Sequence, residues 1–312
     1  MLQNFHRSAC WFLILCCFSS FIAKVTVAGD IENINLDPAP VWVIEYDVGP
    51  VDDIPIDEVS NGVFYQMVDD QIQISKSGIR TSYARYIETI VNQAGLDSSS
   101  QINLNFDPSY QKVALHSLFI LRNGQYLDRL QTAKKTLLNR ESELNKQIYS
   151  GSLTLNILIS DLQVGDTLDY SYTRYGANPV YRNAFSYRRN LNWSVPVNTQ
   201  HLRILWGKPN PLFVTPRNIS PTIEQNILEE FTEYKVTIHK AEVVKTPTQM
   251  SAWQDPYGSI YFSESENWRD VVAWAKPLYK FDNIHPSVAK IAEATNNLYP
   301  RNRNTIFARR LS

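Results

Sequence analysis

Cysteine is almost absent from this chain, and all three examples, Cys10, Cys16 and Cys17, lie close to its beginning. If that first segment is removed on export, the rest of the chain carries no thiol. It then has no disulfide, no thiolate metal site and no cysteine nucleophile, because each of these needs a cysteine side chain. We therefore expect side-chain packing and sheet pairing to stabilise the fold.

Several sequence patterns typical of enzymes are also missing. The eleven glycines form neither a Gly-x-Ser-x-Gly motif nor a glycine-rich phosphate loop, and the five histidines form no His-x-x-x-His or His-Glu-x-x-His pair. His116 lies among alternating apolar residues, so we interpret it as a hydrogen-bonded strand histidine. The sequence thus offers no candidate catalytic, metal-binding or cofactor-binding residue, and we expect neither enzymatic activity nor a cofactor.

Neither sign of charge predominates, since the net charge is −1. No cluster of Lys and Arg lies in the body of the chain. This balance argues against nucleic-acid binding. Several acidic residues are close in sequence, but none follows the Asp-x-Asp-x-Asp-Gly pattern of a calcium loop. We interpret them as turn residues and solvated strand ends. They are Asp52, Asp53, Asp57, Glu58, Asp69, Asp70, Asp161, Asp166 and Asp169.

The first 28 residues have the features of a secretory signal peptide. An apolar run from Ala9 to Ala23 follows Arg7 and leads to the small-x-small pattern Thr26-Val27-Ala28. The run is shorter than the roughly 20 apolar residues of a membrane-spanning helix. We therefore expect cleavage, no transmembrane segment afterwards, and a periplasmic or extracellular location.

Alternation of apolar and polar residues dominates the first two-thirds of the chain and predicts β-strands. The predicted strands cover 41–46, 63–74, 83–91, 102–106, 185–193, 199–206 and 231–244. Asn123-Gly124 predicts a tight hairpin within 112–130. A second hairpin is predicted from 153–157 to 168–173, with Gly165 in its turn. Four prolines in 207–222 favour a loop or edge segment that joins two sheets.

The fold class expected from these patterns is mainly β, an antiparallel β-sandwich-like body with a short α-helical C-terminal segment. Within 264–279 the spacing of Trp268 and Val272 predicts a helix, with Ser265 as its cap, and a second helix is predicted from Ser287. The predicted parts are a signal peptide (1–28), a β-rich domain (29–262), a helical segment (263–300) and a basic tail (301–312) with four arginines.

Tyrosine is frequent, and several tyrosines in the predicted strands could line a ligand groove, although sheet packing explains them more simply. These residues are Tyr83, Tyr86, Tyr170, Tyr172, Tyr175, Tyr181 and Tyr187.

A combination of short motifs resembles a known bacterial family over roughly residues 60–275. The motifs include Tyr65 to Gln71, Phe106 to Gln111, Leu121-Arg122-Asn123-Gly124, Asn139-Arg140-Glu141, Tyr149-Ser150-Gly151, Leu162 to Asp166, Tyr170 to Thr173, Gly176 to Pro179 and Trp268 to Trp274. Together they are similar to the domain of unknown function 3857 family. The resemblance implies a β-rich region that precedes a papain-like transglutaminase core with a cysteine, a histidine and an aspartate.

The printed sequence ends at Ser312, before the segment that would bring the family's cysteine nucleophile. We therefore expect an exported, non-catalytic β-rich module that binds a peptide, a glycan or an envelope protein. One alternative is a truncated transglutaminase-like or cysteine-peptidase-like enzyme, inactive as it stands. Another is a structural envelope protein that assembles through exposed strand edges or an apolar patch.

Overall fold

The computed structural model describes residues 34–49, 51, 53–139, 151–245, 251, 254–279 and 285–298. Strands account for 44% of the chain and helices for 15%, which confirms the mainly β fold class. The predicted signal peptide and the basic tail lie outside the described residues. Among the helices that the structure describes, none is long and apolar enough to span a membrane.

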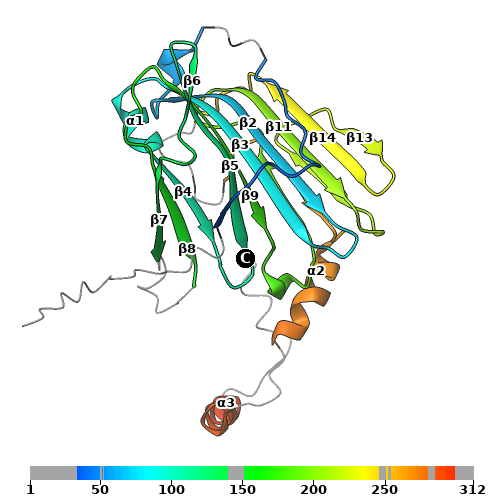
Figure 1. The fold of residues 1–312 in the computed structure, drawn as a ribbon. Helices are drawn as coiled ribbons and strands as arrows, with labels where there is room; N and C mark the ends of the chain where they lie inside the picture. Colours follow the sequence, from blue (N-terminus) through cyan, green and yellow to red (C-terminus); the bar gives the residue numbers. More distant parts are fainter. Residues whose placement is uncertain are drawn as a thin grey trace, which may run out of the picture.

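A large sheet forms the centre of the molecule (Figure 1). Its strands, in spatial order, are β1 (Ile34–Leu36), β5 (Lys112–Arg122), β9 (Thr167–Tyr175), β3 (Arg80–Ile90), β2 (Val63–Ile74), β11 (Val197–Trp206), β14 (Thr232–His239) and β13 (Glu224–Ile227), while β6 (Gln125–Asp128) also pairs with β5. Most pairs are antiparallel, as predicted, but β1 with β5 and β2 with β11 are parallel. The sheet is therefore mixed.

Two small antiparallel sheets accompany the large one. The first consists of β4 (Gln101–Phe106), β8 (Leu153–Leu158) and β7 (Lys134–Asn139), and the second of β10 (Ser186–Asn190), β15 (Ser259–Ser263) and β12 (Phe213–Arg217). β12 holds Pro216 at the edge of its sheet, as the density of prolines predicted. The segment before it joins the large sheet to this small sheet, which also agrees with the prediction.

Both small sheets pack on the same face of the large sheet, which we call the inner face. The cross-strand register aligns Leu115, Tyr172, Ala84, Asp70 and Leu202 in one row, so these side chains point to one side. Leu115 belongs to a hydrophobic core with the β4–β8–β7 sheet, whereas Leu202 belongs to a second core with the β10–β15–β12 sheet. The inner face thus carries two separate apolar cores with the middle strands between them.

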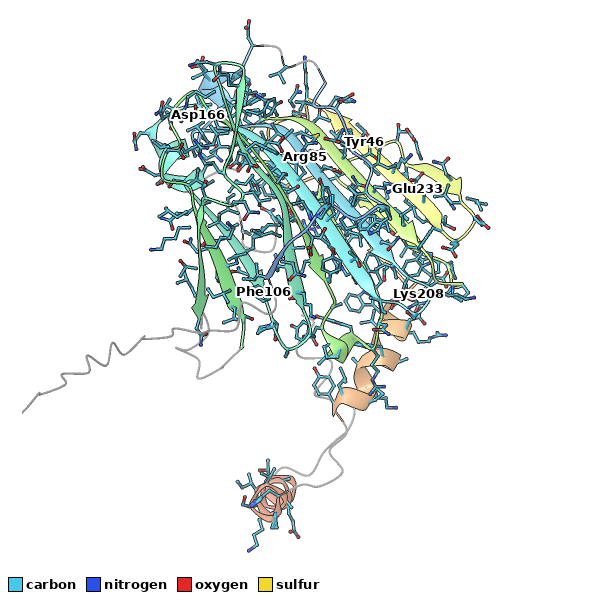
Figure 2. All side chains as sticks on the ribbon, viewed as in Figure 1. Tyr46, Arg85, Phe106, Asp166, Lys208 and Glu233 are labelled. Carbon is cyan, nitrogen blue, oxygen red and sulfur yellow. The ribbon has the colours of Figure 1, made fainter. Side chains whose placement is uncertain are left out.

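The opposite, outer face is crossed by residues 37–49, which we call the strap; it is the dark blue segment in front of the sheet in Figure 1. Residues 41–46 were predicted to be a strand, and this prediction is wrong. Instead of pairing with a strand, Ile44 exchanges two hydrogen bonds with the side-chain amide of Gln71, and the carbonyl of Trp42 accepts one from Arg203. In Figure 2 Tyr46 lies on this face, where its ring stacks on His201 at 4.0 Å.

The two predicted hairpins have different outcomes. The Asn123-Gly124 hairpin is confirmed, because β5 pairs with β6 and both turn residues have positive φ angles. The hairpin predicted from 153–157 to 168–173 is wrong. β8 pairs with β4 and β7, whereas β9 pairs with β3 and β5 in the large sheet. Alternation identifies a strand but is the same whichever partner the strand takes, so the sequence did not reveal this crossover.

The helical elements are short. They are α1 (Gln93–Ser99), α2 (Trp268–Ala275), α3 (Pro286–Leu298) and the 3-10 turns at Ile56–Glu58, Pro179–Tyr181 and Lys276–Tyr279. Both predicted C-terminal helices are confirmed, but α2 is capped by Asn267 and Asp270 rather than by Ser265. Neither α1 nor β15 was predicted from the sequence.

Candidate functional site

The strands between the two cores carry aromatic and charged side chains on the inner face. These strands are β2, β3 and β9, and their inner-face residues between the cores include Asp70, Tyr86, Glu88, Tyr170 and Tyr172. The neighbouring small sheets leave hollows over them. Ligand-binding sites are usually hollows lined by aromatic rings and a few converging polar groups, so these hollows are candidate binding sites.

One of these hollows, which we call the aromatic cavity, has a volume of about 330 Å³. Its lining combines five aromatic rings with polar groups from α1 and β4: Tyr65, Tyr86, Glu88, Ser98, Ser99, Gln101, Ile102, Asn103, Leu104, Tyr170, Tyr172 and Trp193. Tyr86 and Tyr170 stack with ring centroids 5.4 Å apart, and Tyr65 meets Trp193 edge to face at 5.1 Å. Both arrangements are favourable for aromatic pairs and fix the shape of the wall.

Glu88 is the carboxyl group of the aromatic cavity, and its side chain is almost completely buried, with 6% of the residue exposed. Burial raises the pKa of Glu88 to about 7, while a hydrogen bond with Ser99 opposes the rise. Near neutral pH this carboxyl therefore exists in both forms, so it can donate a hydrogen bond as well as accept one.

Helix α1 brings Ser99 to Glu88, and a close approach of two glycines positions this helix. A Cβ atom on Gly95 would lie 1.9 Å from the carbonyl oxygen of Gly62, so a larger residue does not fit there. Asn92 caps the helix by accepting a hydrogen bond from the Gly95 amide. The wall of the cavity thus depends on this contact between α1 and the start of β2.

An ion pair lies next to the aromatic cavity. Arg189 of β10 and Asp70 of β2 approach to 2.8 Å between Nη1 and Oδ2, and the Arg189 guanidinium lies 5.4 Å from the centre of the Trp193 ring. Burial raises the pKa of Asp70, and the charge of Arg189 opposes this rise. The pair joins the two layers because its members come from different sheets.

The acidic residues singled out in the sequence are not all at turns. Asp69 and Asp70 lie in the middle of β2, and Asp69 is buried, so the interpretation of this pair as a turn or a solvated strand end is wrong. Asp161 pairs with Arg129 and Asp166 with Arg122, at 2.6 and 2.7 Å. Asp169 pairs with Arg85 at 2.8 Å. Among the described residues, no group of three or more His, Cys, Asp and Glu could hold a metal ion.

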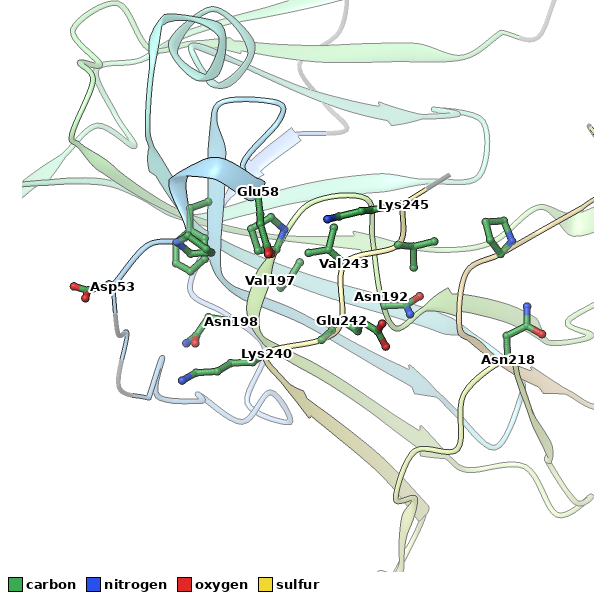
Figure 3. A pocket seen from close by; sticks show the side chains of 16 residues that line it. Asp53, Glu58, Asn192, Val197, Asn198, Asn218, Lys240, Glu242, Val243 and Lys245 are labelled. Atoms are coloured by element: carbon green, nitrogen blue, oxygen red, sulfur yellow. The ribbon is translucent and has the colours of Figure 1, made fainter. Parts of the chain in front are cut away.

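A larger cavity of about 880 Å³ lies away from these rings (Figure 3). Loops and strand ends form it, and charged side chains of both signs surround it, among them Asp53, Glu58, Lys240, Glu242 and Lys245. Its aromatic residue, Phe64, is 4% exposed. A cavity with mixed, exposed charges and little aromatic surface offers a ligand less than the aromatic cavity does, in spite of its greater volume.

The tyrosines considered as groove residues do not all lie in one place. Tyr86, Tyr170 and Tyr172 come together in the aromatic cavity, because they occupy inner-face positions of the adjacent strands β3 and β9. Tyr181 lines a separate hollow at the other end of the same strands. Tyr83 lies on the outer face instead, where its ring stacks on His116 at 5.9 Å.

His116 makes two hydrogen-bond contacts of 2.7 Å, one with the Asp37 carbonyl and one with the Thr173 hydroxyl. This confirms its interpretation as a hydrogen-bonded strand histidine. Sequence reasoning missed Tyr65, Glu88 and Trp193. The two-residue spacing of Tyr86 and Glu88 could have placed these two on one face, but only the tertiary structure brings Trp193 to them.

The fold defines the class of protein as a β-sandwich-like module in which one large sheet carries two small sheets on the same face. Within this class the chain belongs to the DUF3857 family, a domain of unknown function with a solved structure, whose family profile matches residues 76–245. The match confirms the resemblance seen in the motifs, which extended over a wider range. No curated protein matches the chain.

Two solved structures that align with this chain resemble it to different degrees. A candidate protease from Parabacteroides distasonis aligns with a TM-score of 0.63 and 13% identity, covering 69% of this chain and 43% of that protein. An M1 zinc metallopeptidase from Deinococcus radiodurans aligns with a TM-score of 0.33 and 11% identity, covering 65% of this chain and 44% of its own. The first comparison shows a shared fold, and the chain spans less than half the length of either protein.

Proposed function

We propose that this chain is an exported, non-catalytic module that binds a glycan in the aromatic cavity. The observation that carries the proposal is the convergence of five aromatic rings around one buried carboxyl with a pKa of about 7. A sugar ring has apolar C–H faces, which pack on aromatic rings, and hydroxyl groups at its edge. Near neutral pH the Glu88 carboxyl can serve as a donor or an acceptor for such hydroxyls.

The chemistry of the cavity supports binding rather than glycoside cleavage. Hydrolysis of a glycosidic bond commonly uses two carboxyl groups, about 5–9.5 Å apart, on either side of the bond. Among the described residues that line the aromatic cavity, Glu88 is the one carboxyl. The export part of the proposal rests on residues 1–28, whose pattern is that of a cleaved signal peptide. Fractionation of expressing cells, with sequencing of the protein's N-terminus, tests that part directly.

Binding of oligosaccharides to the purified protein tests the proposed ligand. An array of neutral and acidic glycans would identify a ligand, and titration calorimetry would then measure its affinity for the wild type and two variants. Trp193→Ala removes a ring and Asn103→Ala an exposed amide. We expect Trp193→Ala to weaken binding about 30-fold, which corresponds to about 2 kcal/mol, and Asn103→Ala to weaken it less.

Tyr126→Ala is the matched control, because Tyr126 is an exposed aromatic residue of β6 at 66% exposure and does not line the cavity. It should bind as the wild type does. Equal affinity of all variants would contradict the proposed site. Binding of extended peptides in place of glycans would contradict the proposed ligand class while leaving the cavity as the site.

A further inference from the structure

A second hollow, which we call the basic cavity, lies at the opposite end of β3 and β9 from Glu88. It has a volume of about 470 Å³, and its lining includes Arg80, Arg174, Tyr110, Asn178, Tyr181 and Asn183. Among the described residues that line it there is no Asp or Glu. The cavity therefore contains two positive charges and no negative charge of its own.

The two arginines are neighbours on the inner face. Arg174 of β9 is the register partner of Ser82, and Arg80 is the next inward-facing residue of β3. Burial lowers the pKa of Arg80, and the positive charge of Arg174 acts in the same direction, while Tyr187 and Asp70 oppose the change. The two guanidinium groups are thus close enough for their charges to repel each other in a partly desolvated environment.

Among the residues that the structure describes, neither Arg80 nor Arg174 forms an ion pair. The Asp70 carboxylate attracts Arg80 at longer range, but it is paired with Arg189 at 2.8 Å. The Nε atom of Arg174 is also buried and has no hydrogen-bond partner. A buried donor on a charged group costs free energy when it is unsatisfied, so this arrangement favours the entry of an acceptor that carries negative charge.

The position of Arg80 is fixed by its surroundings. Its Nε donates a hydrogen bond of 3.0 Å to the Ser82 hydroxyl, and its Cζ lies 5.5 Å from the ring centres of both Phe185 and Tyr187. Stacking on aromatic rings holds a guanidinium in place while its remaining N–H groups stay available to an acceptor. Arg80 is therefore preorganised for an anion, which reduces the entropy cost of binding.

We propose that the basic cavity is an oxyanion-binding site in which Arg80 and Arg174 together hold a carboxylate, sulfate or phosphate group, either as a free anion or as part of a larger molecule. The forked guanidinium donors match the oxygen pairs of these groups. The site does not depend on the aromatic cavity, because the arginines would bind a free anion whether or not a glycan binds near Glu88. If both sites are occupied by one molecule, that molecule carries an acidic group.

Free anions test this proposal separately from the glycan. The thermal midpoint of the purified protein would be measured with inorganic phosphate, sulfate and acetate, each against chloride at matched ionic strength, and calorimetry would give the affinity of the best anion. We expect at least one of the three to stabilise the wild type, and Arg174→Gln to weaken its binding by about tenfold or more. Comparison of the three identifies which oxyanion the cavity prefers.

The thermal midpoint of Arg174→Gln in chloride, without an added oxyanion, gives a second readout. Because Arg174→Gln removes one of two repelling charges, it should unfold no earlier than the wild type in chloride alone. Arg174→Lys keeps the charge but loses the fork, so it should bind the anion with intermediate affinity. Arg217→Gln is the control, since Arg217 is an exposed arginine of β12 outside the cavity, and it should behave as the wild type does.

Three outcomes would overturn the proposal. One is the absence of any stabilisation by the three anions relative to chloride. Another is an equal loss of anion binding in Arg174→Gln and Arg217→Gln, which would mean general surface electrostatics. The third is a marked loss of stability of both Arg174 variants in chloride, which would mean that Arg174 serves the fold. Each differs from a failure of glycan binding, which leaves these anion measurements unchanged.

Discussion

Two buried carboxyl groups on opposite faces of the large sheet have a raised pKa and no ion-pair partner among the described residues. Glu88 lies on the inner face and Asp69 on the outer face, with 6% and 1% of the residue exposed. Neither forms an ion pair with a described residue, and burial raises the pKa of each to about 7. His201 differs, because burial lowers its pKa to about 4, so it is neutral at physiological pH.

The raised pKa of Glu88 predicts a pH-dependent stability. Between its ordinary value of 4.5 and about 7, the folded protein holds a proton that the unfolded chain has released, so the contribution of this group falls as pH rises through that window. Glu88→Gln removes this dependence. From pH 4.5 to 8 the free energy of unfolding of the variant should gain up to about 3 kcal/mol relative to the wild type, as urea titrations would measure.

A control variant and a contradicting outcome can be named for the comparison of Glu88→Gln with the wild type. Glu230→Gln changes an exposed carboxyl in the β13–β14 turn and should leave the pH dependence of the wild type unchanged. Asp69→Asn should act in the same direction as Glu88→Gln. A constant difference between Glu88→Gln and the wild type across this pH range would show that Glu88 titrates normally in the folded protein.

At the scale of elements, the strap is the segment whose attachment depends most on single side chains. The Gln71 side-chain amide accepts a hydrogen bond from the Ile44 N–H at 3.0 Å and donates one to the Ile44 carbonyl at 2.6 Å. One side chain thus satisfies both backbone groups that a paired strand would otherwise satisfy. Ile44 itself is 37% exposed, and Val41 is fully exposed. Apolar burial of these two residues therefore contributes little, and the hydrogen bonds hold the strap on the sheet together with the stacking of Tyr46 on His201.

Gln71→Ala should therefore release the strap while the β body stays folded. The loss of both hydrogen bonds is expected to cost about 1–3 kcal/mol locally and to speed hydrogen exchange at the Ile44 amide about tenfold. Exchange measured by NMR or mass spectrometry would report it. The control is Gln73→Ala on the same strand and face, because Gln73 lies two residues from Gln71 and has no contact with Ile44 among the hydrogen bonds described. Unchanged exchange at Ile44 in Gln71→Ala would mean that other contacts hold the strap.

At the scale of the whole molecule, two apolar cores share one sheet. Leu168 is fully buried in the core under the β4–β8–β7 sheet, and Ile204 is fully buried in the core under the β10–β15–β12 sheet. Continuous hydrogen bonding runs between them through β3 and β2. The candidate site lies over these connecting strands, so its geometry depends on both cores.

We predict that the two cores unfold as one cooperative unit. Leu168→Ala and Ile204→Ala should each destabilise the protein by about 2–5 kcal/mol, because each leaves a cavity in a packed core. In calorimetry, each variant should shift a single transition rather than separate it into two. A transition that splits in either variant would show that the halves of the sheet are independent folding units.

The sequence by itself determined several strands and one hairpin, because these depend on local properties. Alternation gave β2, β3, β4 and β11 nearly as they are, since successive side chains of a strand point to opposite faces whatever its partner. Asn123-Gly124 specified its turn through positive φ angles. The sequence also identified the family, because the short motifs are specific in combination and the family profile matches residues 76–245.

Only the tertiary structure decided which strands pair and what their side chains meet. The parallel pairing of β2 with β11 joins segments far apart in the sequence, and the crossing from β8 to β9 changes sheets where a hairpin was predicted. Such choices depend on how much apolar surface is buried by distant partners, which no local pattern records. For the same reason, the meeting of Trp193 with Glu88 and of Arg80 with Arg174 became visible only when the layers were assembled.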